Sequence, residues 1–97
     1  MAYARITRFT GATPEQIQAV VSQVDAAEGP PPGVPSSGVK LIVNEDEGTL
    51  IFVGFFETEE DLRTGDAVLR GMDPPGGTPG TLASVDMGEI RVEKQAS

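Results

Sequence analysis

The chain has 97 residues, which is enough for one domain with a modest core. It contains no cysteine, histidine or tryptophan, so disulfides, thiol nucleophiles and histidine-based catalytic triads are excluded. Fifteen acidic residues against seven basic ones give a formal charge of −8, which argues against nucleic acid and anionic membrane surfaces as partners.

No apolar run approaches the roughly 20 residues of a membrane-spanning helix. The opening residues, MAYARITRF, lack the apolar stretch and cleavage site of a signal peptide. We therefore expect a cytoplasmic protein with one domain over residues 1–97. Carboxylates alone make a poor zinc site, and the acidic segment 45–48 misses the calcium-loop spacing, so the sequence predicts neither a metal nor another cofactor.

The first predicted elements are a strand and a helix. The strand covers Tyr3–Phe9, with Tyr3, Arg5, Thr7 and Phe9 on one face. Thr13 and Gln16 then form a T-x-x-Q capping box with Pro14 at the first helical position, which predicts a helix start. Gly29 is the expected C-terminal cap. An apolar stripe at helical spacing contains Ile17, Val20, Val21, Val24 and Ala27.

The proline-rich segment Pro30–Gly38 favours a stiff, extended conformation, and we interpret it as a connector. Its Pro32-Gly33-Val34-Pro35 spacing also fits a PxxP ligand, but such spacing is common by chance.

The most apolar part of the chain is a predicted β-hairpin. Its strands are Val39–Val43 and Thr49–Phe56, joined by an acidic turn that ends at Gly48. The second strand is apolar on both faces: Ile51, Val53 and Phe55 point one way, and Leu50, Phe52 and Phe56 the other. Helices cover one face, and we expect a second copy of the chain to cover the other, although the sequence leaves open which face is which.

A second helix begins after Thr58, which can cap it, with acids in the first turn. Its stripe contains Leu62, Gly65, Val68, Leu69 and Met72. Glycine is unfavourable inside a helix, so Gly65 suggests close approach to a neighbouring backbone. The segment 73–75 (Asp-Pro-Pro) is expected to end the helix. A flexible loop (76–80) and a strand over Leu82–Val92 follow. The apolar phase of that strand changes near Gly88, which predicts a bulge at Gly88-Glu89. Residues 93–97 should fray.

The resulting order is β-α-β-β-α-β, an α+β ferredoxin-like fold with a four-stranded antiparallel sheet and two helices on one face. The segments YARITRF, GVKLIVNEDEGTLIFVGFFETEEDL and SVDMGEIRVE resemble small bacterial proteins of the antibiotic-biosynthesis-monooxygenase-like (ABM-like) group in the dimeric α/β barrel superfamily. The resemblance implies a homodimer in which two sheets face each other as a barrel.

The catalytic side of that resemblance does not carry over. Cofactor-independent monooxygenases of the group use Asn, Trp and His around an aromatic substrate, and haem-degrading members need a histidine to ligate iron. This chain has no His or Trp, and Asn44, its only Asn, falls in the predicted turn. Haem degradation is therefore not expected.

The remaining candidate site residues are few. A buried carboxylate with a raised pKa would suit acid–base chemistry, and Asp86 on the last strand is the best candidate. Tyr3 and Arg5 share a strand face on which they would orient a ligand, and Phe52, Phe55 and Phe56 would line an apolar pocket. For each residue a purely structural role is the simpler interpretation.

Three functions stay open. The first is a homodimer whose sheet–helix cavity binds a small apolar or aromatic molecule, with monooxygenase- or isomerase-type turnover as one form of it. The second is a non-catalytic binding or accessory module on the same fold. The third is an amino-acid-sensing module, although such modules usually accompany a larger enzyme.

Overall fold

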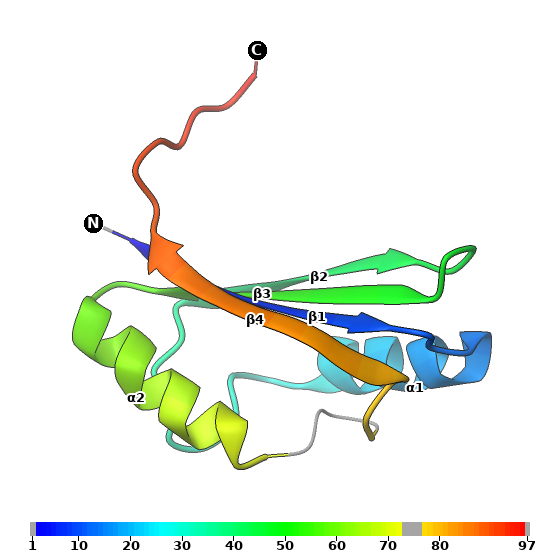
Figure 1. Cartoon of the computed structure of the whole chain (residues 1–97). Helices are drawn as coiled ribbons and strands as arrows, with labels where there is room; N and C mark the ends of the chain where they lie inside the picture. Colours follow the sequence, from blue (N-terminus) through cyan, green and yellow to red (C-terminus); the bar gives the residue numbers. More distant parts are fainter. Residues whose placement is uncertain (1, 73–76, 97) are drawn as a thin grey trace.

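The computed structural model describes residues 2–72 and 77–96. It contains a four-stranded sheet with strand order β2-β3-β1-β4, in which neighbouring strands are antiparallel. Both helices lie on one side of the sheet, and the other side is bare (Figure 1). The fold is the predicted ferredoxin-like one. The elements are β1 (Tyr3–Thr10), α1 (Pro14–Ala26), β2 (Gly38–Asn44), β3 (Thr49–Phe56), α2 (Glu59–Arg70) and β4 (Thr81–Glu89).

Both helix starts are capped as predicted. At α1 the Gln16 backbone N–H donates to Thr13 Oγ1 (3.2 Å), and the Thr13 N–H donates to Gln16 Oε1 (2.9 Å), which completes the capping box. At α2 the Asp61 N–H donates to Thr58 Oγ1 (3.0 Å). These bonds satisfy backbone donors that have no partner within the helix.

The predicted end of α1 was wrong. Its C-cap is Ala27, with extended backbone (φ −71°, ψ 134°), and not Gly29. The chain leaves the helix directly into the extended proline-rich segment, so no left-handed glycine is needed there. Helix α2 ends at Arg70 with Gly71 as its C-cap. The predicted stop at residues 73–75 and Gly76 of the predicted loop lie outside the described residues.

Strand register fixes which face meets the helices. Phe9 pairs with Leu50, and Thr7 pairs with Phe52, in the two central strands. Phe9 and Leu50 are buried together with Ile17 and Val20 of α1. The face with Leu50, Phe52 and Phe56 is therefore the covered one, which settles a point that the sequence left open.

The predicted bulge in β4 was misplaced. The register shifts where Arg8 pairs with Ser84 and Phe9 with Leu82, so Ala83 is the extra residue. At Gly88 the pairing with β1 is regular. The apolar phase changes near Gly88 because β4 ends at Glu89, after which Ile90 makes a backbone bond to the Ala2 carbonyl (2.8 Å).

Helix α2 packs closely on the sheet through Gly65, but its close neighbour is a side chain and not the backbone that the sequence suggested. A Cβ added at Gly65 would lie 2.5 Å from Cε1 and 2.8 Å from Cζ of Phe56. The Phe56 ring is fully buried, in a cluster with Val34 and Leu62. The proline-rich connector thus contributes Val34 to the core beneath α2.

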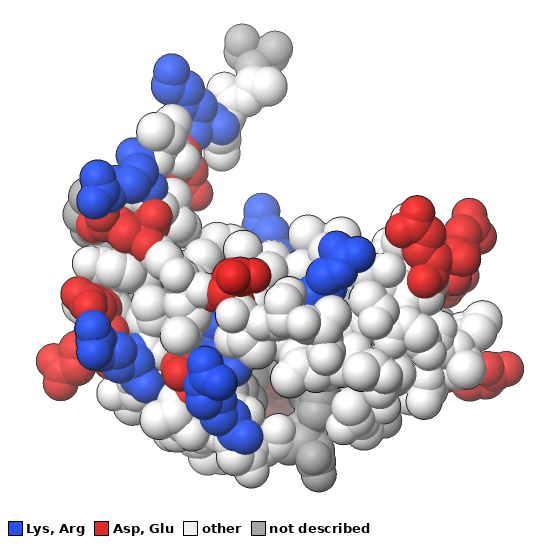
Figure 2. Space-filling model, in the orientation of Figure 1, with Lys and Arg blue, Asp and Glu red and all other residues white. Residues whose placement is uncertain are grey.

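The bare face of the sheet carries apolar side chains on three of its four strands, β1, β2 and β3. Ile6 pairs with Val53, and Ile42 pairs with Ile51. Ile6 is 39 % exposed and Ile42 is 52 % exposed. Charged residues lie around this patch: Arg8 and Lys40 are on the same face, and acidic side chains gather at the end of the β2–β3 hairpin, over the turn (Figure 2). We refer to this helix-free surface as the bare face.

Candidate functional site

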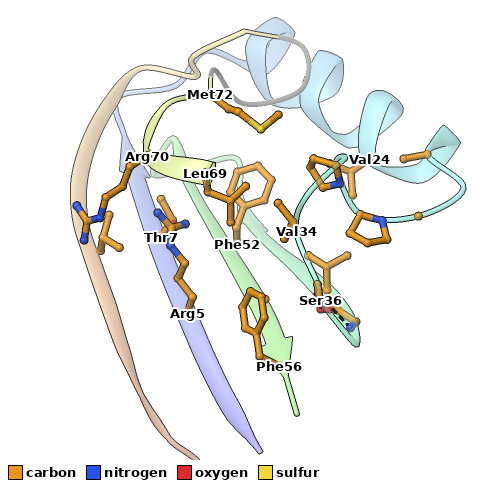
Figure 3. A pocket seen from close by; sticks show the side chains of 18 of the residues that line it. Arg5, Thr7, Val24, Val34, Ser36, Phe52, Phe56, Leu69, Arg70 and Met72 are labelled. Carbon is orange, nitrogen blue, oxygen red and sulfur yellow. Dashed lines mark hydrogen bonds between the residues drawn. The ribbon is translucent and has the colours of Figure 1, made fainter. Parts of the chain in front are cut away.

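A hollow lies between the sheet and the two helices. It has a volume of about 860 Å³. Its walls come from the C-terminal ends of α1 and α2 and from the proline-rich segment, and its floor is the covered face of the sheet (Figure 3). This volume falls within the usual range for small-molecule sites. The apolar residues lining it include Phe9, Val24, Val34, Phe52, Phe56, Leu69, Met72, Leu82 and Val85.

The cavity exists because the helices cover different parts of the sheet. Helix α1 packs over Phe9 and Leu50, whereas α2 packs over Phe56. Between those two clusters, β3 carries Gly54 on the covered face, directly opposite Arg5 of β1. Gly54 lines the cavity, and a Cβ added there would lie 3.5 Å from Cε2 of Phe56, so the absence of a side chain leaves room for the Phe56 ring beside the cavity.

The floor of the cavity holds a buried, hydrogen-bonded arginine. Arg5 Nε donates to Asp66 Oδ1 of α2 (2.9 Å), and Arg5 Nη1 donates to Thr7 Oγ1 (2.8 Å). The second carboxylate oxygen of Asp66 accepts from Arg70 Nε (2.8 Å). A single carboxylate thus joins two guanidinium groups, and Arg5 and Thr7 lie side by side on β1 in Figure 3.

The pKa of Asp66 reflects opposing effects. Burial alone raises the pKa of this carboxyl, but hydrogen bonds and positive charges from Arg70 and Arg5 outweigh burial and hold its pKa below the ordinary value. Asp66 is therefore ionised at neutral pH, and the network is an ion cluster.

The structure brings together only part of the predicted site. Arg5, Phe52 and Phe56 line the cavity. Tyr3, although on the same strand face as Arg5, lies beside α2 in a separate polar hollow with Glu59, Leu62, Arg63 and Asp66.

Phe55 and Asp86 lie on the bare face, away from the cavity. Phe55 pairs with Ala4, and Asp86 pairs with Ile6. Asp86 is exposed, so it lacks the buried, apolar surroundings that an acid–base role requires. Alternation along a strand explains the separation of Phe55 from Phe52 and Phe56, because neighbouring side chains point to opposite faces.

Sequence reasoning missed Thr7, Gly54, Asp66 and Arg70. Asp66 left a signal: it lies four residues after Leu62 and three before Leu69, so it shares the apolar stripe of α2. An acid on such a stripe needs a buried partner. Among the described residues, no three His, Cys, Asp or Glu side chains are grouped so as to hold a metal ion. No described helix is long and apolar enough to cross a membrane.

Comparison with known proteins adds evidence at the level of the fold. No family model matches the sequence. No curated protein matches it either. A solved structure from Chloroflexus aurantiacus J-10-fl, described as a "putative Antibiotic biosynthesis monooxygenase", superposes with a TM-score of 0.59 at 15% sequence identity. The match covers 99% of this chain and 98% of that chain.

The chain has the fold of the ABM-like proteins. The fold expected from the resemblance is thereby confirmed. At this level of identity the likeness concerns the ABM-like fold alone, so the ligand and the chemistry have to be argued from this chain's own cavity.

Proposed function

We propose that this protein is a homodimer that binds a small apolar or aromatic molecule in the cavity between its sheet and helices. The observation that carries the proposal is the cavity itself, about 860 Å³ with aromatic and aliphatic walls and few polar groups on its floor. A well-formed apolar hollow with a few convergent polar groups is the usual form of a small-molecule site. Burial of apolar ligand surface against Phe52, Phe56 and Leu69 supplies the affinity.

The bare face supports the homodimer. Ile6 and Ile42 are substantially exposed on it, next to Ile51, Val53 and Phe55. Contiguous apolar surface of this kind favours association. The face also carries Arg8, Lys40 and Asp86, so charges of both signs are available to a two-fold interface in which the same surface contributes from both copies.

Native mass spectrometry of the purified protein tests both parts. We expect a dimer, with either bound extra mass or the capacity to take up the neutral fluorophore N-phenyl-1-naphthylamine. A monomer at micromolar concentration would contradict the homodimer. A dimer that neither carries extra mass nor binds the fluorophore would contradict the ligand site.

A second candidate is an enzyme of cofactor-independent monooxygenase or isomerase type that uses the same cavity. The similarity in fold to the Chloroflexus protein described as a "putative Antibiotic biosynthesis monooxygenase" favours it. The described residues of the cavity offer Arg5 and Thr7 as groups that would orient a substrate, and Glu28 is the carboxylate among those that line it. Oxygen uptake above the protein-free rate, measured with an electrode in the presence of 1,4-dihydroxynaphthalene, would support the monooxygenase; no excess uptake would count against it.

A further inference from the structure

Arg5 is placed to meet a ligand. It is 9 % exposed and lines the cavity. Its Nε and Nη1 atoms each donate to a protein oxygen, at Asp66 and Thr7. A guanidinium carries five N–H donors, so most of its donors are not used by these two bonds.

The unused donors are open to the cavity. Within residues 2–72 and 77–96, Arg5 Nη2 makes no hydrogen bond, and no fully buried side-chain nitrogen or oxygen there lacks a partner. Nη2 is therefore accessible, and the cavity is the space that Arg5 lines. The Thr7 hydroxyl accepts from Arg5 and so keeps its own O–H for donation beside it.

The charge of the cluster points the same way. Asp66 is one carboxylate shared by Arg5 and Arg70, so the group carries one net positive charge. Arg5 brings its guanidinium to the cavity floor, where it is buried against Asp66, whereas the side chain of Arg70 is 57 % exposed and is screened by solvent. An anion in the cavity would therefore meet the charge of Arg5 at close range. The acid that lines the mouth, Glu28, is exposed to solvent, which screens it.

We infer that the cavity ligand is a singly charged organic acid: an apolar or aromatic body with one carboxylate or comparable oxyanion, which receives the free N–H edge of Arg5 and the Thr7 hydroxyl. The apolar body lies along Phe52, Phe56 and Leu69. This inference rests on the proposed function, because it specifies the chemistry of the molecule that the same cavity binds. Arginine suits the task, since its fork matches the geometry of a carboxylate.

Two probes of the same shape test the charge requirement: 2-naphthoate and the neutral 2-naphthamide, titrated calorimetrically at pH 7 and low salt. We expect 2-naphthoate to bind about tenfold or more tightly, the size typical of a hydrogen bond to a charged group. Arg5→Met should abolish the preference, so that the two probes bind with equal affinity. Arg63→Met, which removes an exposed arginine that pairs with Glu59 on the same helix as Asp66, is the matched control and should keep the preference.

Each result decides between the proposals. Equal affinity of the wild-type protein for both probes overturns the acid inference and leaves the apolar site standing; this comparison needs no variant and holds even if Arg5→Met fails to fold. A preference that persists in Arg5→Met also overturns it. Failure of both probes to bind contradicts the proposed function itself.

Discussion

The contact between Gly65 and Phe56 gives a stability prediction whose sign can be worked out. Replacing Gly65 by Ala places a methyl carbon 2.5 Å from Cε1 of Phe56, where ordinary contacts begin at 3.4 Å. Val34 Cγ1 lies 3.4 Å from the same added carbon, and Phe56 is only 1 % exposed, so the added methyl enters a packed region. Either the ring or helix α2 must shift.

Two effects oppose each other in Gly65→Ala. Alanine favours a helix interior over glycine by about 1 kcal/mol. Overpacking a core by one carbon costs roughly 1–3 kcal/mol. With a middle value of about 2 kcal/mol for the clash, the variant should lose about 1 kcal/mol of unfolding free energy. Because the clash is with Phe56, Phe56→Leu should relieve it, and the double variant should show a coupling energy of about 1–2 kcal/mol.

Urea denaturation of the wild type, both single variants and the double variant at one protein concentration measures this cycle. Thr64→Ala, at the exposed neighbouring position of α2, is the control and should change stability little. A Gly65→Ala protein that is more stable than the wild type, with no coupling to Phe56, would refute the close-packing argument.

Three further predictions concern the interface, the ion cluster and the cavity. Ile42→Glu on the bare face should weaken dimerisation about 100-fold or more, because it buries two charges per dimer. Leu82→Glu changes a site that is also 52 % exposed but lies on the covered face, and it should not weaken dimerisation. Light scattering that shows both variants to be dimeric would contradict this prediction. Because the pKa of Asp66 is lowered in the folded protein, its ionised form stabilises the fold at pH values above the ordinary pKa of 3.8, and this stability is lost as pH falls through the folded pKa. The stability lost in Asp66→Asn, measured by urea denaturation, should therefore be largest near pH 7 and shrink below pH 4. A loss that does not depend on pH would argue against the ion cluster. Gly54→Val should add bulk between the cavity and the Phe56 ring, which lies 3.5 Å from an added Cβ, and should weaken N-phenyl-1-naphthylamine binding about tenfold or more. Gly88→Val on the bare face, where an added Cβ meets nothing within 4 Å, should retain binding. Equal binding by both variants would place the site elsewhere.

Local chemistry made the elements predictable. The T-x-x-Q box marked the start of α1, Thr58 with its following acids marked α2, and two apolar runs around an acidic turn marked the hairpin. In the turn, Gly48 has a positive φ of 66°, which glycine adopts readily. These signals depend on neighbours in the sequence, which is why they could be recognised without a structure.

The end of β4 was harder to predict, because a change of apolar phase has two possible causes. A bulge and the end of a strand both place the next apolar residue out of register. The pairing with β1 decides between them: Gly88 pairs regularly with Ala4, and the extra residue is Ala83. Register with a distant strand is a property of the tertiary structure.

The candidate site was predictable only in part for the same reason. Arg5 and the aromatic residues of β3 were identified from strand alternation, but the sequence could not tell which face the helices cover, so Phe55 was grouped with Phe52 and Phe56. Asp66 is 61 positions from Arg5 along the chain, and only the packing of α2 on β1 joins them. The open space beside Gly54 likewise results from two helices that cover separate parts of the sheet.

The central claim is that the sheet–helix cavity takes up a small apolar molecule. Intermolecular NOEs between N-phenyl-1-naphthylamine and methyl groups of the protein test it most directly. The account predicts NOEs to Val24, Val34 and Leu69, which line the cavity. NOEs confined to Ile42 and Val53 on the bare face, or none at saturating probe, would contradict it.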